Sequence, residues 1–229
     1  MIKISSKNKT IYGSIDLESS KSISNRLLII KALCKTKFRI QNLSNAKDTK
    51  ILNELLDRFN KRIDLNCEDA GTALRFLIAF LATKEGIWRV SGSKRMHERP
   101  VKPLIDCLKE LGAEIKYLEK VGFPPIEIKS KKLKSKKLSL QGDISSQFIS
   151  ALLLVAPTIE NGLTLEITSK VLSKPYIDMT LGLMSEFGIE YSWENNVIKV
   201  EQQSYLAKNI EVENDWSAAS FWYSFLALS

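Results

Sequence analysis

Histidine and cysteine are scarce in this 229-residue chain, which has one histidine and three cysteines. Cys34, Cys67 and Cys107 are widely spaced, odd in number and without a Cys-x-x-Cys motif, so we expect three reduced thiols. With His97 as the single histidine, a zinc site is not expected. The chain also lacks an apolar run of about 18 residues, which a membrane helix requires, and an apolar signal-peptide core at its N-terminus. These absences predict a cytoplasmic protein with no membrane partner.

Positive charge is in excess, with a formal net charge of +8. Much of it comes from residues 129–137, where six of nine residues are lysine. Such a run is ordinarily a solvated loop or hairpin. The alternative is a nucleic-acid interface, but the run has no interleaved aromatic residue and no arginine for base edges. We therefore predict no nucleic-acid partner, although a positive field would attract small phosphorylated anions.

One pattern recurs along the chain, a small polar cluster followed by an apolar helix. The four copies begin near Ser20, Asp69, Asp143 and Asp215. A second helix is predicted after each of the first three copies, at residues 48–59, 100–112 and 174–188. Short alternating segments predict strands at residues 38–40, 87–90, 114–117, 126–128, 138–140, 163–167 and 197–200. This order predicts three whole strand–helix–strand–helix–strand–strand units between residues 14 and 212.

The hydrophobic pattern predicts where these elements lie. The first helix of each unit is apolar nearly all round, most clearly at residues 148–155, so it should be buried. The strands alternate apolar and polar residues, so one face of each sheet should meet water. We therefore predict an α/β (α+β) fold with buried helices in the middle and four-stranded sheets outside. The fourth copy stops inside its first helix at Ser229, from which we expect a fragment whose other half is missing.

The polar clusters lie where a helix presents unpaired N–H groups and a partial positive charge. Small residues there allow an anion to approach, and hydroxyl groups add donors. The candidates are Lys21, Ser22 and Arg26 in the first cluster, Gly71 and Thr72 in the second, and Ser145, Ser146 and Gln147 in the third. Any one cluster is ordinarily just an N-cap, but three of them in a repeated architecture could meet at one rim and form an anion site.

Arg95 and Arg99 add two cations just before the helix that starts near Pro100. A guanidinium fork matches the oxygens of a carboxylate or phosphate. The alternative is a surface ion pair with Glu98. His97 has no nucleophile beside it in the sequence, so we interpret it as a surface or packing residue.

Five motifs occur in the order seen in one known family. They are Ser20-Lys21-Ser22-x-Ser24-Asn25-Arg26, Ala70-Gly71-Thr72-Ala73-x-Arg75, Arg95-Met96-x-Glu98-Arg99-Pro100, Ser145-Ser146-Gln147-Phe148 and Ser173-Lys174-Pro175-Tyr176-Ile177-Asp178. In these motifs the chain resembles EPSP synthase (3-phosphoshikimate 1-carboxyvinyltransferase), along essentially its whole length. The resemblance implies the enolpyruvyl transferase fold, with three βαβαββ repeats per domain. It also implies three parts: residues 1–13 as a strand of the otherwise missing C-terminal domain, residues 14–212 as the N-terminal domain, and residues 213–229 as the crossover and first helix of the C-terminal domain.

The resemblance implies an activity as well. The enolpyruvyl group of phosphoenolpyruvate is transferred to the 5-hydroxyl of shikimate 3-phosphate, and phosphate is released, a step of chorismate and aromatic amino acid biosynthesis that needs no metal or organic cofactor. The family's acid/base carboxylates lie in the C-terminal domain, so this chain alone is expected to bind the acceptor and turn nothing over. Glu213 and Asp215 are expected to be hinge residues, and the chain is expected to be a monomer.

Roles follow for the residues that match the motifs. Lys21 would be the shared contact to both substrates. Shikimate 3-phosphate is expected at Lys21, Ser22, Arg26, Ser145, Ser146, Gln147, Ser173 and Tyr176, and phosphoenolpyruvate at Gly71, Thr72, Arg99 and Gln147. Two anions would meet in such a site, so its cations and N–H dipoles must offset their repulsion.

Three places depart from the family pattern. Glu18 and Ser19 stand where Pro-Gly or Pro-Ala is common. Asp69 stands where Asn is common, so its carboxylate would oppose phosphoenolpyruvate unless it is paired. Phe76 stands where some members have Pro, which could reshape that pocket and its response to glyphosate. A second candidate with the same fold and donor is UDP-N-acetylglucosamine enolpyruvyl transferase, which the first and fourth motifs disfavour, and the candidate from another class is a basic nucleic-acid-binding module.

Overall fold

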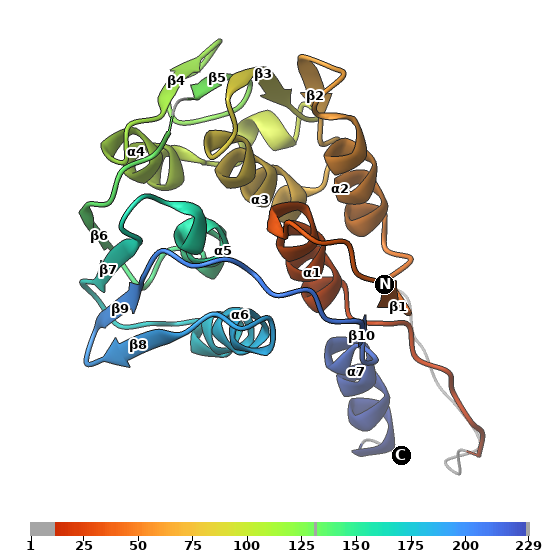
Figure 1. Cartoon of the computed structure of the whole chain (residues 1–229). Coiled ribbons are helices and arrows are strands. Elements are labelled where there is room, and N and C mark those ends of the chain that lie inside the picture. Colours follow the sequence, from red (N-terminus) through yellow and green to blue (C-terminus); the bar gives the residue numbers. More distant parts are fainter. Residues whose placement is uncertain (1–11, 131, 228–229) are drawn as a thin grey trace.

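The structure, a computed structural model, describes residues 12–130 and 132–227, which contain seven α-helices and ten strands (Figure 1). The α-helices are α1 (Lys21–Leu33), α2 (Lys47–Arg58), α3 (Gly71–Ala82), α4 (Lys102–Glu110), α5 (Ser146–Val155), α6 (Lys174–Glu186) and α7 (Trp216–Ala227), with short 3-10 helices at Met96–Glu98 and Ala156–Thr158. None of the helices described here is long and apolar enough to cross a membrane. The strand predicted at residues 1–13 falls mostly on residues 1–11, which lie outside the described residues.

Two four-stranded sheets share one topology, with strand orders β2-β3-β5-β4 and β6-β7-β9-β8. In each sheet the first pair is parallel and the other two pairs are antiparallel. The strands are β2 (Asp64–Asn66), β3 (Gly86–Ser91), β4 (Glu114–Tyr117) and β5 (Ile126–Ser130), then β6 (Lys137–Leu140), β7 (Leu163–Ile167), β8 (Tyr191–Glu194) and β9 (Val197–Val200). In chain order the units are β2-α3-β3-α4-β4-β5 and β6-α5-β7-α6-β8-β9. The predicted internal repeat is therefore present as two complete βαβαββ units.

Within the described residues, the first unit is shorter than the sequence predicts. It contains α1, β1 (Ile40–Gln41) and α2, and β1 pairs in parallel with β10 (Ile210–Glu211) near the other end of the chain. Only residues 59–63 separate α2 from β2, and this linker is too short for a further hairpin, because strands usually take about 3–10 residues each. The expectation of three whole units holds for two of them, and the first sheet has two strands in the described residues.

The helices form the core and the sheets lie outside, as predicted (Figure 1). Almost every residue of α3 and α5 is buried, and α1 is buried from Ile23 to Ile30. These three helices contact one another, which explains why the apolar residues of α3 and α5 occur on every side of the helix. Strands β6 and β7 alternate buried with more exposed residues, so one face of their sheet meets water.

Two chain segments, residues 18–20 and 213–215, pair antiparallel next to the start of α7. The backbone N–H of Ser20 donates to the carbonyl of Glu213 at 2.8 Å, and the N–H of Asp215 donates to the carbonyl of Glu18, also at 2.8 Å. The expected hinge residues Glu213 and Asp215 therefore lie where these two segments pair. From this place α7 projects away from the core (Figure 1).

The lysine-rich run extends from the end of β5 to Lys137, the first residue of β6. Its lysines pair with glutamates from other segments, in the pairs Lys129–Glu114 (3.8 Å), Lys132–Glu160 (3.3 Å), Lys136–Glu110 (3.1 Å) and Lys137–Glu166 (2.8 Å). These exposed pairs add little stability, but they offset much of the positive charge of the run. The structure thus favours a solvated loop over a nucleic-acid interface.

The three cysteines are free thiols, as predicted. Burial raises the pKa of both Cys67 and Cys107 to about 12, so neither thiol ionises near neutral pH. Among the described residues, no group of three or more His, Cys, Asp or Glu side chains is placed to hold a metal ion.

Candidate functional site

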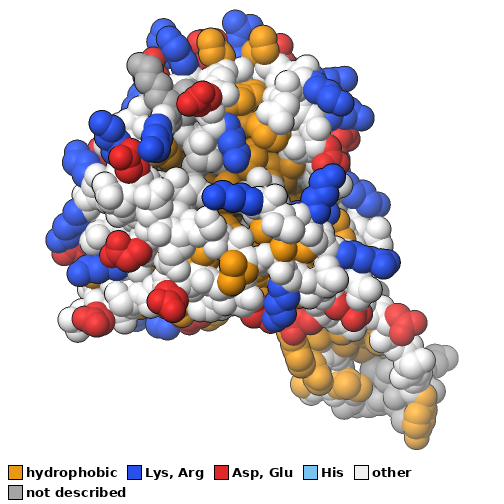
Figure 2. Space-filling model, in the orientation of Figure 1, with side chains coloured by type: hydrophobic (Ala, Val, Ile, Leu, Met, Phe, Trp, Pro, Cys, Tyr) orange, Lys and Arg blue, Asp and Glu red, His pale blue; other side chains and the backbone are white. Residues whose placement is uncertain are grey.

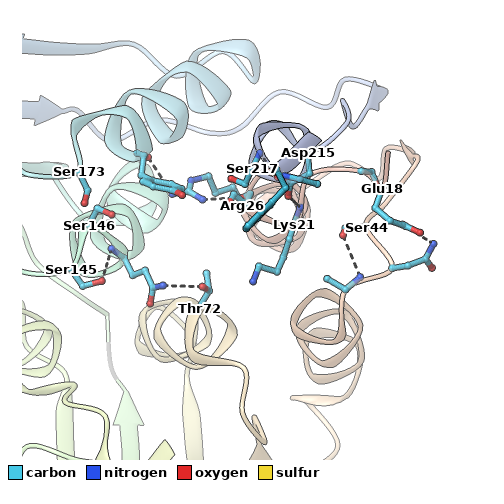
Figure 3. A pocket seen from close by; sticks show the side chains of 18 residues that line it. Glu18, Lys21, Arg26, Ser44, Thr72, Ser145, Ser146, Ser173, Asp215 and Ser217 are labelled. Carbon is cyan, nitrogen blue, oxygen red and sulfur yellow. Dashed lines mark hydrogen bonds between the residues drawn. The ribbon is translucent and has the colours of Figure 1, made fainter. Parts of the chain in front are cut away.

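The N-terminal ends of six helices open onto one cavity. Residues in or beside the first turns of α1, α2, α3, α5, α6 and α7 line a space of about 890 Å³. Figure 3 shows Lys21 approaching it from α1, Thr72 from α3 and Ser145 from the start of α5. The lining residues are Glu18, Ser19, Lys21, Ser22, Arg26, Ser44, Asn45, Ala46, Thr72, Ser145, Ser146, Gln147, Ser173, Tyr176, Asp215, Ser217, Ala218 and Phe221. The prediction that the polar clusters meet at one rim is confirmed.

The sequence caps some of these helices and leaves others open. Ser20 and Ser145 cap α1 and α5, because each side-chain oxygen accepts a hydrogen bond from a backbone N–H in the first turn. Ala70 and Ser173, which precede α3 and α6, make no such hydrogen bond. The first N–H groups of α3 can therefore donate to an anion. In α6, Pro175 has no N–H and the N–H of Tyr176 already donates to the carbonyl of Ser173, so that helix start offers the N–H of Lys174.

Arg26 places a buried positive charge at the wall of this cavity of about 890 Å³, which is called the larger cavity below. Its side chain is 3% exposed, and burial lowers the pKa of Arg26 to about 10, so the guanidinium is still charged at neutral pH. Its hydrogen-bond partners are neutral oxygens, from Thr180, Ser22, Ser150 and Tyr176. A buried cation without a counter-charge favours an anionic ligand.

A smaller cavity of about 280 Å³ adjoins the first. It is lined by Lys21, Asp48, Asp69, Gly71, Thr72, Arg95, Met96, Arg99 and Gln147. Within residues 12–130 and 132–227, Arg95 and Arg99 form no ion pair with a carboxylate, so the pair with Glu98 that the sequence left open is not formed there. The smaller cavity therefore has two exposed arginines available for an anion.

Three residues, Lys21, Thr72 and Gln147, line both cavities. The side-chain Nε2 of Gln147 donates to Thr72 Oγ1 at 3.1 Å. The Oε1 of Gln147 is buried and has no hydrogen-bond partner in the described chain. Gln147 and Lys21 are therefore placed between the two cavities, at the position where a group of each ligand would meet.

Gly71 makes room for arginine side chains at the start of α3. A Cβ at this position would lie 2.9 Å from Arg99 Cζ and 3.1 Å from Arg75 Nη1. Arg75 donates to the carbonyls of Gly71 (2.8 Å) and Pro100 (3.0 Å). Burial first, and the nearby charge of Arg99 second, lower the pKa of Arg75 to about 10. Two guanidinium groups and an open helix start thus concentrate positive charge at the smaller cavity.

The unusual residues have identifiable surroundings. Asp69 lines the smaller cavity and accepts a hydrogen bond from the Ser93 hydroxyl, so its carboxylate is partnered but not neutralised. Phe76 is buried, and its ring centre lies 5.5 Å from Arg26 Cζ, where the ring face stabilises the cation. Glu18 lines the larger cavity.

Asp215 also lines the larger cavity, but its carboxylate is engaged with the backbone. It accepts hydrogen bonds from the N–H groups of Ser217 (2.8 Å), Ala218 (3.3 Å) and Lys21 (3.3 Å). One carboxylate thus caps α7 and touches the start of α1. The hinge role of Asp215 stays a prediction.

All eight residues implied for shikimate 3-phosphate line the larger cavity, and all four implied for phosphoenolpyruvate line the smaller one. The sequence analysis missed other lining residues, namely Ser44, Asn45, Asp48, Ser217 and Phe221. A polar pair in a loop or a carboxylate in a first helical turn carries no distinctive pattern, so only the packing reveals them. His97 lies outside both cavities, is partly buried, and has Nδ1 3.7 Å from Glu119, as expected of a surface or packing residue. Its Nε2 is buried and has no hydrogen-bond partner within the described residues.

Comparison with known proteins gives the fold and the family of the chain. The fold is similar to that of EPSP synthase from Acinetobacter baumannii, with a TM-score of 0.80 and 20% identity over 91% of this chain and 51% of that chain. The chain therefore has the enolpyruvyl transferase fold. The family model for EPSP synthase (3-phosphoshikimate 1-carboxyvinyltransferase) matches residues 5–63 and 57–229, so the chain belongs to the EPSP synthase family.

Relatives with the name 3-phosphoshikimate 1-carboxyvinyltransferase give the same result. One from Bacteroides fragilis is 46% identical over 220 residues, which are 96% of this chain and 53% of the relative. One from a Sulfurovum species is 38% identical over 245 residues, which cover 95% of this chain and 57% of the relative. The chain thus spans about half the length of the curated relatives it matches.

Proposed function

We propose that this chain binds shikimate 3-phosphate in the larger cavity and phosphoenolpyruvate in the smaller one, as a part of an EPSP synthase. In that reaction the 5-hydroxyl of the acceptor attacks phosphoenolpyruvate, and inorganic phosphate leaves after a tetrahedral intermediate. The observation that carries the proposal is the pair of adjoining cavities that share Lys21 and Gln147. Two anions that must react repel each other. Cations and N–H dipoles that line both cavities offset that repulsion.

Some side chains of the site would supply positive charge, and others would orient the ligands by hydrogen bonds. Arg26 and Lys21 supply positive charge on the acceptor side, and Arg99 supplies it on the donor side. The hydroxyls of Ser145 and Ser146 at the start of α5 and of Ser173 at the start of α6 would donate hydrogen bonds to the acceptor, and Tyr176 lines the same cavity. Holding both ligands in one orientation removes much of the entropic cost of their encounter.

Turnover on this account needs a second half that carries the acid/base groups. Residues 14–212 form the acceptor-binding domain, and residues 213–229 lead into the second domain. The apolar side chains of α7, which are mostly exposed here, would pack against that domain. The chain alone is expected to bind substrate and release no phosphate.

Calorimetric titration with shikimate 3-phosphate tests the proposal. We expect Lys21→Ala and Arg26→Ala each to weaken binding by at least about tenfold, because each removes a charge-assisted hydrogen bond worth about 1.5–3 kcal/mol. Lys31→Ala and Arg58→Ala are matched controls, since both residues are exposed and lie outside the two cavities.

Equal binding by the control and test variants would contradict the proposed site. Binding of an oligonucleotide with a steep loss at higher salt, together with no heat from shikimate 3-phosphate, would support the nucleic-acid alternative instead.

A further inference from the structure

Arg26 is held by a small network that no carboxylate enters. Its Nε donates to Thr180 Oγ1 at 2.7 Å, and its Nη2 donates to Ser150 Oγ at 3.1 Å and to the carbonyl of Tyr176 at 3.2 Å. Its Nη1 donates to the carbonyl of Ser22 at 2.8 Å. The two hydroxyls come from α5 and α6, so three helices meet at this guanidinium.

The protons in this network can be assigned by counting donors. Thr180 Oγ1 lies 2.7 Å from the carbonyl of Tyr176, which can only accept, so Thr180 donates there. Ser150 Oγ lies 2.8 Å from Thr180 Oγ1, and since the Thr180 proton is already used, Ser150 must donate to Thr180. Both hydroxyls are then left as acceptors toward Arg26, and each has its own proton satisfied.

The network fixes the guanidinium without cancelling its charge. Four of its five N–H groups have acceptors, and the remaining one is on Nη1. The rings of Phe76 and Tyr176 lie 5.5 Å and 5.9 Å from Arg26 Cζ. A carboxylate in place of either hydroxyl would form an ion pair with Arg26 and reduce its attraction for a ligand anion.

We propose that Ser150 and Thr180 are positioning residues that hold the Arg26 guanidinium toward the larger cavity while leaving its charge for the anionic acceptor. Both side chains are 0% exposed, and neither lines the cavity, so they act through Arg26 and not by touching the ligand. The inference rests on the proposed function, in which Arg26 binds shikimate 3-phosphate.

A ligand-free measurement tests the positioning directly. In a ¹H–¹⁵N spectrum of the arginine side chains, the Nε–H of Arg26 is assigned as the signal that disappears in Arg26→Lys. We expect this signal to exchange slowly with water in the wild-type chain, to exchange at least about tenfold faster in Thr180→Val, and to slow again in Thr180→Ser. Ser150→Ala, which removes a smaller part of the network, is the second variant if Thr180→Val does not fold.

Titration with shikimate 3-phosphate then tests whether the positioning matters for binding. We expect Thr180→Val to weaken binding about tenfold in the wild-type background and less than about twofold in the Arg26→Lys background, because the two side chains act as a unit. Thr83→Val is the matched control, since the Thr83 hydroxyl also donates to a carbonyl in its own helical turn, Phe80 at 2.7 Å, and lies outside the cavities.

The two readouts separate the possible failures. An Nε–H signal that is unchanged in Thr180→Val, or an equal loss of affinity in both backgrounds, would overturn the positioning role. A wild-type chain that does not bind shikimate 3-phosphate would overturn the proposed function, and the Nε–H exchange rate alone would then decide whether the hydroxyls hold Arg26.

Discussion

Arg26 differs from the surface cations because it is buried without a carboxylate partner. Some exposed lysines pair with carboxylates, as in Lys102–Asp106 and Lys208–Glu186. In the described chain Arg26 and Arg99 have no such partner. Unpaired positive charge is costly where it is buried, and an anionic ligand would relieve that cost. The buried charge of Arg26 therefore indicates an anion site independently of any motif.

Gly71→Ala is expected to weaken phosphoenolpyruvate binding more than shikimate 3-phosphate binding. The added methyl group would lie 2.9 Å from Arg99 Cζ, so the arginine must move within the smaller cavity. We expect a loss of about five- to fiftyfold in affinity for phosphoenolpyruvate, in the range of one displaced charge-assisted contact. Calorimetry with each ligand measures the difference, and an equal loss for both would contradict it.

Asp69→Asn is expected to strengthen phosphoenolpyruvate binding. An amide oxygen at this position can still accept the hydrogen bond from Ser93, while the negative charge in the smaller cavity is removed. Partly screened charges predict a modest gain of about two- to fivefold. Asp106→Asn, which removes an exposed charge outside both cavities, should leave the affinity unchanged. Weaker binding by Asp69→Asn would show that the carboxylate serves the ligand.

At the scale of elements, one tyrosine ties the returning chain to the core. The hydroxyl of Tyr205 donates to the carbonyl of Leu154 in α5 at 2.8 Å, and burial raises the pKa of Tyr205. Tyr205→Phe should lower the free energy of unfolding by about 1–2 kcal/mol, because a buried acceptor loses its partner. Tyr191→Phe, at a 39% exposed position, is the control in urea unfolding. Equal stability of the two variants would mean that this hydrogen bond contributes nothing.

Helices were predictable from the sequence because their patterns are local. The apolar residues of α3 and α5 repeat on every face, and a buried helix is the arrangement that such a pattern favours. Strands β2, β8 and β10 were missed. β8 is mostly exposed and does not alternate, and the pairing of β10 with β1 depends on the whole fold between them.

Site residues were predictable where they stand in a motif and not where packing places them. Lys21 and Gln147 follow from their motifs, and the structure puts both between the cavities. Ser150 and Thr180 are single polar residues within helices, and their role requires knowing that α1, α5 and α6 meet at Arg26. The ligand roles of the motif residues and the monomeric state stay predictions.

At the scale of the whole molecule, α7 stands apart from the core. Figure 2 shows hydrophobic side chains gathered on the projecting part of the molecule at lower right, where α7 lies in Figure 1. Trp216, Phe221, Tyr223 and Phe225 are each at least 60% exposed, and Ala219 is the buried residue of the helix. An exposed apolar helix of this kind is typical of a surface that another part covers.

Substitution of two phenylalanines, one in the core and one on α7, should change the free energy of unfolding by very different amounts. Phe80→Ala, at a fully buried position of α3, should lower the free energy of unfolding by about 3–5 kcal/mol. Phe225→Ala, at a 60% exposed position of α7, should change it by less than about 0.5 kcal/mol. Urea unfolding of both variants makes the comparison. A large loss in Phe225→Ala would mean that α7 is packed within this chain.

Ligand mapping by nuclear magnetic resonance tests the two-cavity account most directly. Backbone amide signals of the chain would be followed during titration with shikimate 3-phosphate and, separately, with phosphoenolpyruvate. The account predicts that shikimate 3-phosphate shifts Ser22, Ser146 and Tyr176, and that phosphoenolpyruvate shifts Gly71 and Arg99. Shifts confined to the lysine-rich segment at residues 132–137, with the cavity residues unchanged, would contradict it.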